Sequence, residues 1–118
     1  MTNSELKRVV VTGIGAMTPI GNTAPEYWEG LSSGRNGIGL ITLFDASRHD
    51  CKIAGEVKGF DPLDYMDRKE AKRMDRFAQF AIAASKEAIA DAQFEITDLN
   101  AEQVGVMIGT GVGGLKVM

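Results

Sequence analysis

The segment His49-Asp50-Cys51 holds the only histidine and the only cysteine of the chain, the side chains best suited to nucleophilic catalysis or metal binding. A reactive cysteine needs a positive surrounding, because the thiolate is the nucleophile. The negative charge of Asp50 would destabilise a thiolate at Cys51, whereas the positive charge of Lys52 would stabilise it. The whole stretch is polar. We therefore expect a solvated surface segment, with catalysis or metal binding as the alternative reading.

Two glycine-rich segments could bind a phosphate or a cofactor. Thr12-Gly-Ile-Gly15 starts like a dinucleotide-binding turn, but Thr18 stands where the third glycine should be. Gly109-Thr-Gly-Val-Gly-Gly114 is not followed by the Lys-Ser/Thr pair of a P-loop. We expect the first segment to be a tight turn after a strand. We expect the second to let the backbone approach a substrate, a cofactor arm or a second subunit.

A cluster of positive charge accompanies the predicted start of a helix, where it opposes the helix dipole. The acidic neighbours Asp67, Glu70 and Asp75 could form local ion pairs with this cluster, which would make it an ordinary solvated face. An acidic or phosphate-bearing partner is the other interpretation. The basic residues are Lys69, Lys72, Arg73 and Arg76.

The first half of the chain reads as a strand, a helix and an edge strand. The β-branched run Arg8-Val-Val-Val-Thr12 suits a strand buried on both faces. Thr23-Ala-Pro-Glu26 is a capping box, in which the Thr23 hydroxyl and the Glu26 carboxylate each bond the other residue's amide. The helix should end near Gly34. Residues 35 to 50 are irregular, and residues 52 to 57 fit an edge strand.

The second half predicts one long helix from about Asp67 to Gln93, with Asp67 as its cap. Residues 77 to 84 carry no charge, so the helix should be buried nearly all round, and its many alanines indicate close backbone packing. A buried strand then starts at Val104. This order of elements predicts an α/β class with a parallel sheet and no internal domain boundary across residues 1 to 118. A parallel strand needs neighbours on both sides, so we expect this chain to be the front part of a larger domain.

Composition narrows the function classes. The chain has 44% hydrophobic and 25% charged residues, which is globular, and its net charge of −3 with a pI near 5.1 argues against nucleic-acid binding. No apolar run reaches the ~18 residues of a membrane span. Residues 1 to 8 lack the apolar core of a signal peptide. A single cysteine fits a reducing cytosol.

Several of these segments together resemble the β-ketoacyl-acyl-carrier-protein synthases. The similar stretches cover essentially the whole chain, in order and with the family's spacing. The "RKEAKRMD" and "GTGVGG" forms are most similar to the type II synthase of bacterial fatty-acid elongation. The stretches are residues 8 to 22, Trp28 to Gly39 with "SGRNGIG", Phe44-Asp45, Arg68 to Asp75 and the closing "IGTGVGGL".

The resemblance implies a thiolase-like α/β fold, incomplete here, and in the whole enzyme a cytoplasmic homodimer. Its reaction is a decarboxylative Claisen condensation on acyl and malonyl groups borne by acyl carrier protein, with no metal and no cofactor. The family's active-site cysteine, two histidines and lysine match nothing in this chain, so its catalytic residues are expected to lie beyond it. By position, Lys69 and Arg73 would contact the carrier protein, and Val112 would be a gate in the acyl-chain pocket.

Two alternatives remain open from the sequence. A polyketide-type ketosynthase has similar N-terminal motifs. A truncated pseudo-synthase would be non-catalytic and would bind a carrier protein or a partner subunit. The reading frame after Met118 separates an enzyme from such a module. The acyl-chain length that the enzyme prefers is not encoded in these residues alone.

Overall fold

The computed structural model describes residues 7–114. Residues 1–6, which form most of the N-terminal segment considered above for a signal peptide, therefore lie outside the described residues. Leu115 of the closing motif also lies outside them. Among residues 7–114, no helix combines the length and the apolar character that crossing a membrane requires. In chain order the elements are α1 (Ala24–Ser32), β1 (Ile38–Leu40), β2 (Ile53–Gly55), the 3-10 turn η1 (Pro62–Asp64), α2 (Arg68–Arg73), α3 (Arg76–Asp91) and the 3-10 turn η2 (Ala101–Gln103).

The capping of α1 follows the expected pattern with one difference. The Thr23 hydroxyl accepts a hydrogen bond from the Glu26 amide at 3.3 Å, as expected of a capping box. The Glu26 carboxylate reaches one residue further back than expected, to the Asn22 amide at 2.8 Å. The helix ends at Ser32, and Gly34 follows with a φ of +68°, a conformation that glycine adopts without a steric cost.

The single long helix predicted from Asp67 to Gln93 is wrong, because the structure breaks it into α2 and α3. Met74 has an extended backbone, with φ −109° and ψ 137°. Asp75 is also extended and accepts a hydrogen bond from the Arg76 amide at 2.7 Å, so it caps a new helix. Asp67 caps α2 as predicted, accepting from the Lys69 and Glu70 amides. An aspartate inside an apolar periodicity thus marks a second helix start.

The predicted parallel sheet is also absent from residues 7–114, where the one sheet is a pair of antiparallel strands. β2 lies within the predicted edge strand, and it pairs with β1, which falls in a stretch expected to be irregular. The two predicted buried strands, residues 8–12 and the segment from Val104, have no strand partner in the described part of the chain. The amides and carbonyls of a strand form hydrogen bonds with a neighbouring strand, and these two segments have no such neighbour. They are therefore not strands in this structure.

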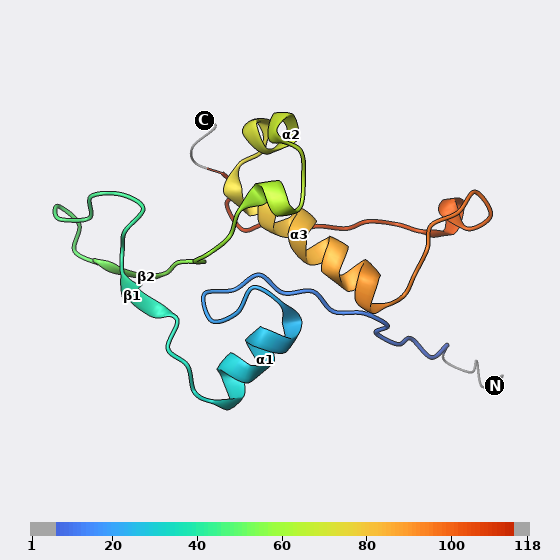
Figure 1. Cartoon of the computed structure of the whole chain (residues 1–118), viewed down its shortest axis with the longest axis horizontal. Helices are drawn as coiled ribbons and strands as arrows, with labels where there is room; N and C mark the ends of the chain where they lie inside the picture. The colour runs from blue at the N-terminus through green and yellow to red at the C-terminus, as the bar shows by residue number, and fades with distance from the viewer. Residues whose placement is uncertain (1–6, 115–118) are drawn as a thin grey trace, which may run out of the picture.

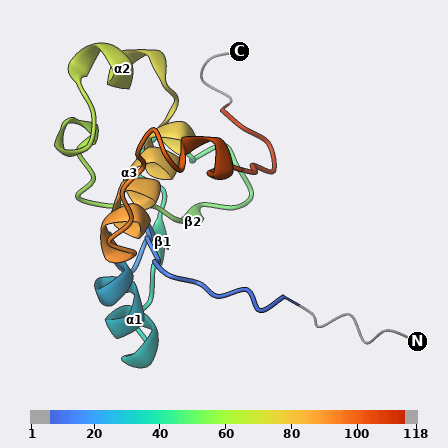
Figure 2. The same ribbon diagram turned by 90° about the vertical axis from the view of Figure 1, so that its right-hand side faces the viewer.

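The elements are arranged around α3, with α1 and α2 on opposite sides of it (Figures 1 and 2). The segment before α1 crosses α3 closely, as the alanines predict. A Cβ added to Gly13 would lie 2.6 Å from the Ala92 amide nitrogen, and one added to Gly15 would lie 2.8 Å from the Ala84 carbonyl carbon. Any larger residue at these two positions would push the segment off the helix.

Little of the chain is buried. Only Ala46, Met66 and Ala83 are buried hydrophobic residues in the described part, and Phe77 of α3 is 40% exposed, so the expectation of a helix buried all round is wrong for this chain. The surface area is 10043 Å², against about 6200 Å² for a compact protein of this mass. The radius of gyration is 18.2 Å, against about 13.5 Å for a compact chain of this length.

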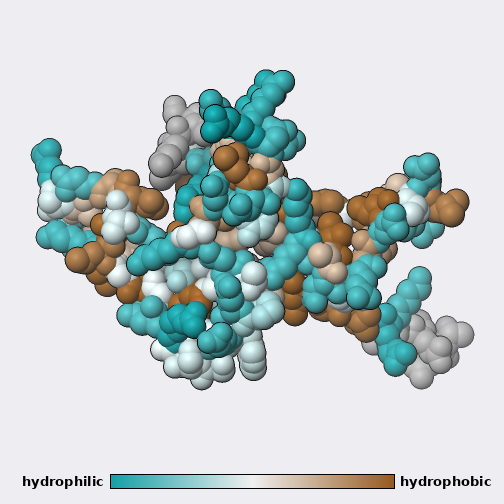
Figure 3. Space-filling model, in the orientation of Figure 1, coloured by the Kyte–Doolittle hydropathy of each residue, from teal (hydrophilic) through white to brown (hydrophobic). Residues whose placement is uncertain are grey.

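Exposed apolar residues occur along much of the described chain, and several of the most exposed ones lie in the two unpaired segments. They include Val9–Val11 before α1 and Val106–Ile108 after η2. Figure 3 shows hydrophobic surface around the loop that follows α3. An apolar surface of this extent is typical of a face that further protein covers.

Candidate functional site

The first candidate feature is the basic face of α2, which we define as Lys69, Lys72 and Arg73. All three side chains are exposed. The helix is only six residues long, and Lys72 and Arg73 occupy its last turn. Positive charge in the last turn complements the helix dipole, so the conflict expected from the sequence does not apply to Lys72 and Arg73 and remains for Lys69, which lies in the first turn. The features of this helix that favour an acidic partner are therefore its exposure and its charge.

The acidic neighbours do not neutralise this face. The Asp67 and Asp75 carboxylates accept backbone hydrogen bonds at the starts of α2 and α3. Among residues 7–114 the one ion pair within 4.0 Å joins Arg35 and Glu29, far from this helix in sequence. The local pairs that would have made the cluster an ordinary solvated face are therefore not formed.

Arg76 does not belong to the basic face, contrary to the sequence interpretation. Its guanidinium lies over the ring of Phe80 at 4.9 Å and over that of Phe60 at 5.6 Å. It also donates a hydrogen bond to the Val57 carbonyl at 2.8 Å. Arg76 therefore joins α3 to the segment after β2 by cation–π contacts, instead of facing a partner.

The second candidate feature is the glycine-rich turn, residues 110–114. The Gly113 amide donates to the Thr110 hydroxyl at 3.1 Å, and Gly113 has a φ of +77°. Val112 is 77% exposed. The turn lies against the start of α3, because Gly114 contacts the Asp75 carboxylate.

A mainly apolar hollow of about 310 Å³ separates this turn from the loop after β1. Its walls are two aromatic rings, one leucine, two glycines and the Asp75–Arg76 start of α3. Val112 directly precedes the two lining glycines in the chain, but it does not line the hollow itself. The lining residues are Leu43, Phe44, Asp75, Arg76, Phe77, Gly113 and Gly114.

Two carboxylates fix the loop that supplies Leu43 and Phe44. Glu56 accepts hydrogen bonds from the Thr42 hydroxyl at 2.7 Å and from the Thr42 and Leu43 amides, and the bond from the hydroxyl is the main reason that its pKa is lowered. Asp45 accepts from the Ser47 amide at 3.0 Å, which lowers the pKa of that carboxyl. Both carboxylates are thus stabilised in their charged form.

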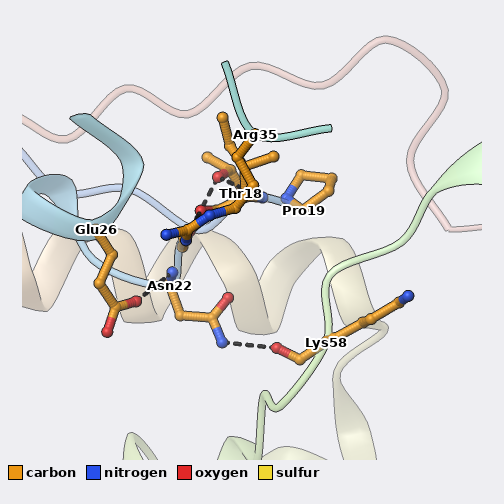
Figure 4. Close-up of a pocket in the computed structure, with 8 residues that line it drawn as sticks. Thr18, Pro19, Asn22, Glu26, Arg35 and Lys58 are labelled. Atoms are coloured by element: carbon orange, nitrogen blue, oxygen red, sulfur yellow. Dashed lines mark hydrogen bonds between the residues drawn. The ribbon is translucent and has the colours of Figure 1, made fainter. Parts of the chain in front are cut away.

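A smaller, polar hollow of about 140 Å³ lies beside the start of α1 (Figure 4). Its polar groups bond one another: the Asn22 side chain donates to the Lys58 carbonyl at 2.7 Å, and Arg35 donates to the Ile20 carbonyl at 3.0 Å. In Figure 4 the Lys58 side chain extends away from Arg35 and Glu26. The hollow therefore joins chain segments and gathers no set of free groups for a ligand.

His49 and Cys51 lie on the surface, as expected. The His49 ring meets Phe44 edge-on, with the ring centroids 5.6 Å apart, and the Cys51 thiol donates to the Ile53 carbonyl. Both side chains are exposed. Within the described residues no group of three or more His, Cys, Asp or Glu side chains could hold a metal ion.

A family model described as the N-terminal domain of β-ketoacyl synthases matches residues 6–117. The chain belongs to the β-ketoacyl synthase family. It is 64% identical over all 118 residues to 3-oxoacyl-acyl-carrier-protein synthase 2 of Synechocystis sp., of which it covers 28%. It is 50% identical over 113 residues to the protein of the same name from Staphylococcus aureus, of which it covers 27%.

The chain therefore spans a little more than a quarter of the length of these relatives. Solved structures of similar fold include "The ishigamide ketosynthase/chain length factor", with a TM-score of 0.67 and 36% identity over 73% of this chain and 21% of that one. A β-ketoacyl synthase from Burkholderia phymatum gives 0.63 and 32% identity over 82% of this chain and 24% of that one. The fold is thus the N-terminal part of the α/β, thiolase-like fold of ketosynthases.

The residue that sequence reasoning missed at this site is Asp75. The sequence indicates only that it belongs to a local charge pattern, whereas it starts α3 and contacts Gly114, 39 residues later in the chain. Its position directly before Arg-Phe at a helix break is the only local signal. The contact with Gly114 has no signature in the sequence.

Proposed function

We propose that this chain is part of a 3-oxoacyl-acyl-carrier-protein synthase, an acyltransferase that elongates fatty acids. The observation that carries the proposal is the 64% identity to the Synechocystis enzyme of that name across every residue of the chain. Its similarity to the ketosynthase/chain length factor is lower, at 36%. This difference favours fatty-acid elongation over a polyketide-type ketosynthase.

The reaction that we propose joins two thioesters. A cysteine thiolate takes the acyl group from one acyl carrier protein and releases the carrier thiol. Malonyl-carrier protein then loses CO2, and its carbanion attacks the acyl-enzyme thioester, which forms the new carbon–carbon bond and expels the cysteine thiolate. Thiolate attack and oxyanion stabilisation lower the barrier. We propose that the cysteine, the two histidines and the lysine for these steps come from residues outside this chain.

Two features of this chain support roles around that chemistry. The exposed, unpaired basic face of α2 suits an acidic carrier protein, and Lys69 and Arg73 are the proposed contacts. Val112 is the proposed gate of the acyl-chain pocket, since it carries the one apolar side chain in a turn that otherwise consists of Thr110 and three glycines. In the complete enzyme the rest of that pocket would come from other parts of the protein.

We further propose that the complete enzyme is a homodimer and works in the cytoplasm. The exposed apolar segment around Val106–Ile108 supports a protein-covered environment for this part of the chain. A single cysteine suits a reducing compartment. The alternative function is a non-catalytic module that uses the basic face of α2 to bind a carrier protein.

The test compares the full-length gene product with isolated residues 1–118, using acyl- and malonyl-carrier protein as substrates. We expect the full-length protein to release CO2 and form 3-oxoacyl-carrier protein, and the isolated chain to do neither. A full-length protein that binds carrier protein without turnover would favour the binding module. Turnover by isolated residues 1–118 that Cys51→Ser abolishes would place the nucleophile in this chain and contradict the proposal.

A further inference from the structure

Asp75 connects two features that the sequence keeps 39 residues apart. One of its carboxylate oxygens accepts a hydrogen bond from the Arg76 amide at 2.7 Å, which fixes the side chain at the start of α3. Its other oxygen faces Gly114. A Cβ added to Gly114 would lie 2.6 Å from the Asp75 Cγ and 2.8 Å from its Cβ, and it would overlap the carboxylate oxygen itself. The turn can approach α3 this closely only with glycine at position 114.

The rest of the glycine-rich turn is held more weakly. Gly113 lies near the Phe77 ring, since a Cβ added there would be 4.0 Å from the ring's Cζ. A Cβ added to Gly109 or Gly111 would meet nothing within 4 Å in the described part of the chain. The tight contact between Asp75 and Gly114 is therefore the feature that sets where the turn lies relative to α3.

We propose that Asp75 is a positioning residue that fixes the glycine-rich turn, and through it the place of Val112 and the range of acyl chains that the enzyme accepts. The inference rests on the proposed function, because it uses Val112 as the gate of the acyl pocket. Asp75 touches neither substrate nor reacting atoms in this scheme. It acts because its carboxylate is already fixed by the helix start and half-buried, so it is a rigid stop for the turn.

The experiment uses the full-length synthase with three variants at this contact. Gly114→Ala forces the turn away from α3, and Asp75→Ala removes the stop together with the helix cap. Asp75→Asn keeps the shape and an oxygen that can accept from the Arg76 amide. Two controls lie elsewhere: Thr23→Ala removes the cap of α1, and Gly39→Ala adds a Cβ where residues 7–114 leave open space.

Two readouts are measured on all variants: the ratio of long to short 3-oxoacyl products, and amide hydrogen exchange in residues 110–114. We expect Gly114→Ala and Asp75→Ala to change the product ratio by about fivefold or more, since a displacement near 1 Å can have large kinetic effects. Exchange in residues 110–114 should become faster. Asp75→Asn should rescue both readouts, and both controls should leave them unchanged.

The two readouts separate the possible failures. Unchanged exchange in residues 110–114 in both Gly114→Ala and Asp75→Ala would overturn the positioning role, whatever the activity of the enzyme. Faster exchange with an unchanged product ratio would overturn the link from the turn to chain length. A wild-type enzyme without condensing activity would instead overturn the proposed function, and the selectivity claim with it. A product ratio that the Thr23→Ala control shifts equally would also overturn the link from Asp75 to chain length, because a general loss of stability would then account for the change.

Discussion

The Glu87 carboxylate, in the C-terminal half of α3, accepts a hydrogen bond at 2.7 Å from the Ala24 amide at the start of α1. Its second oxygen accepts from the Ala16 amide at 2.9 Å. Asp91, one turn later, accepts from the Ile14 amide at 2.9 Å. Two side chains of α3 thus satisfy two amides of the segment that Gly13 and Gly15 bring close to the helix, and the first amide of α1.

We expect Glu87→Ala to destabilise the full-length protein by about 2–3 kcal/mol, because the two amides that lose a charged acceptor are partly buried. Glu87→Gln, which keeps one acceptor oxygen, should cost roughly half as much. Thermal or urea unfolding measures both. Glu102→Ala is the matched control, because Glu102 is exposed and belongs to η2, outside α1 and α3. A loss for Glu87→Ala no larger than for this control would contradict the role of Glu87.

The double variant Lys69→Glu with Arg73→Glu should weaken carrier-protein binding roughly tenfold, mostly through slower association and with a strong dependence on salt. Turnover of small thioester substrates should stay nearly unchanged, since neither side chain would reach the pocket. The control is Arg48→Glu with Lys52→Glu, which makes the same charge change at exposed residues between β1 and β2. Equal loss with carrier-borne and small substrates would mean that the fold had been damaged.

Val112→Phe in the complete enzyme should exclude medium and long acyl chains while short primers still react, because a larger side chain narrows the proposed gate. Val112→Ala should relax the limit. The ratio of kcat/KM values for long and short primers should move by about tenfold or more, the scale at which a pocket senses a few methylenes. If the Phe variant loses activity equally on short and long primers, Val112 is not the gate.

Lowering the pH should release the Glu56 contacts that hold the loop after β1. Since the pKa of Glu56 is lowered from 4.5 in the folded chain, the unfolded state binds more protons as the pH falls. The stabilisation is therefore complete above the unfolded value and is lost as the pH falls through the folded one. Melting temperatures from about pH 6 down to about pH 3 should drop more steeply for wild type than for Glu56→Gln. Parallel curves would show that these hydrogen bonds contribute no pH-dependent stability.

Residues 1–118 produced alone should associate or remain poorly folded, because the chain buries only three hydrophobic residues in its described part. Light scattering and the steepness of thermal unfolding report these properties. Val106→Asp with Ile108→Asp should reduce the association, since both side chains are exposed and apolar. A monodisperse wild-type monomer that unfolds cooperatively would disprove this expectation.

Local patterns in the sequence predicted local structure well. The Thr23 cap, the Gly34 stop, the Asp67 cap and the position of β2 were each visible in a few neighbouring residues. The alanines of α3 also predicted that other backbone would pack closely against it. These features depend on propensities and hydrogen bonds within one or two turns of chain, so the sequence carries them directly.

The failures came where long-range contacts decide the structure. The periodicity of residues 67 to 93 predicts one helix, because an apolar stripe continues across the break while the Asp75 cap interrupts the backbone. The strands at 8–12 and after Val104 lack sheet partners in the described residues. The Asp75–Gly114 contact joins distant segments, so no local pattern could reveal it.

Because of the break between α2 and α3, the directions of the side chains in α3 do not depend on the number of residues in α2. In one continuous helix, each inserted or deleted residue would rotate every later side chain by about 100° about the axis. Here Met74 and Asp75 absorb such a change, because α3 starts from its own cap. A length change within α2 can therefore alter the charges it presents without turning Phe77 or Glu87 away from their contacts.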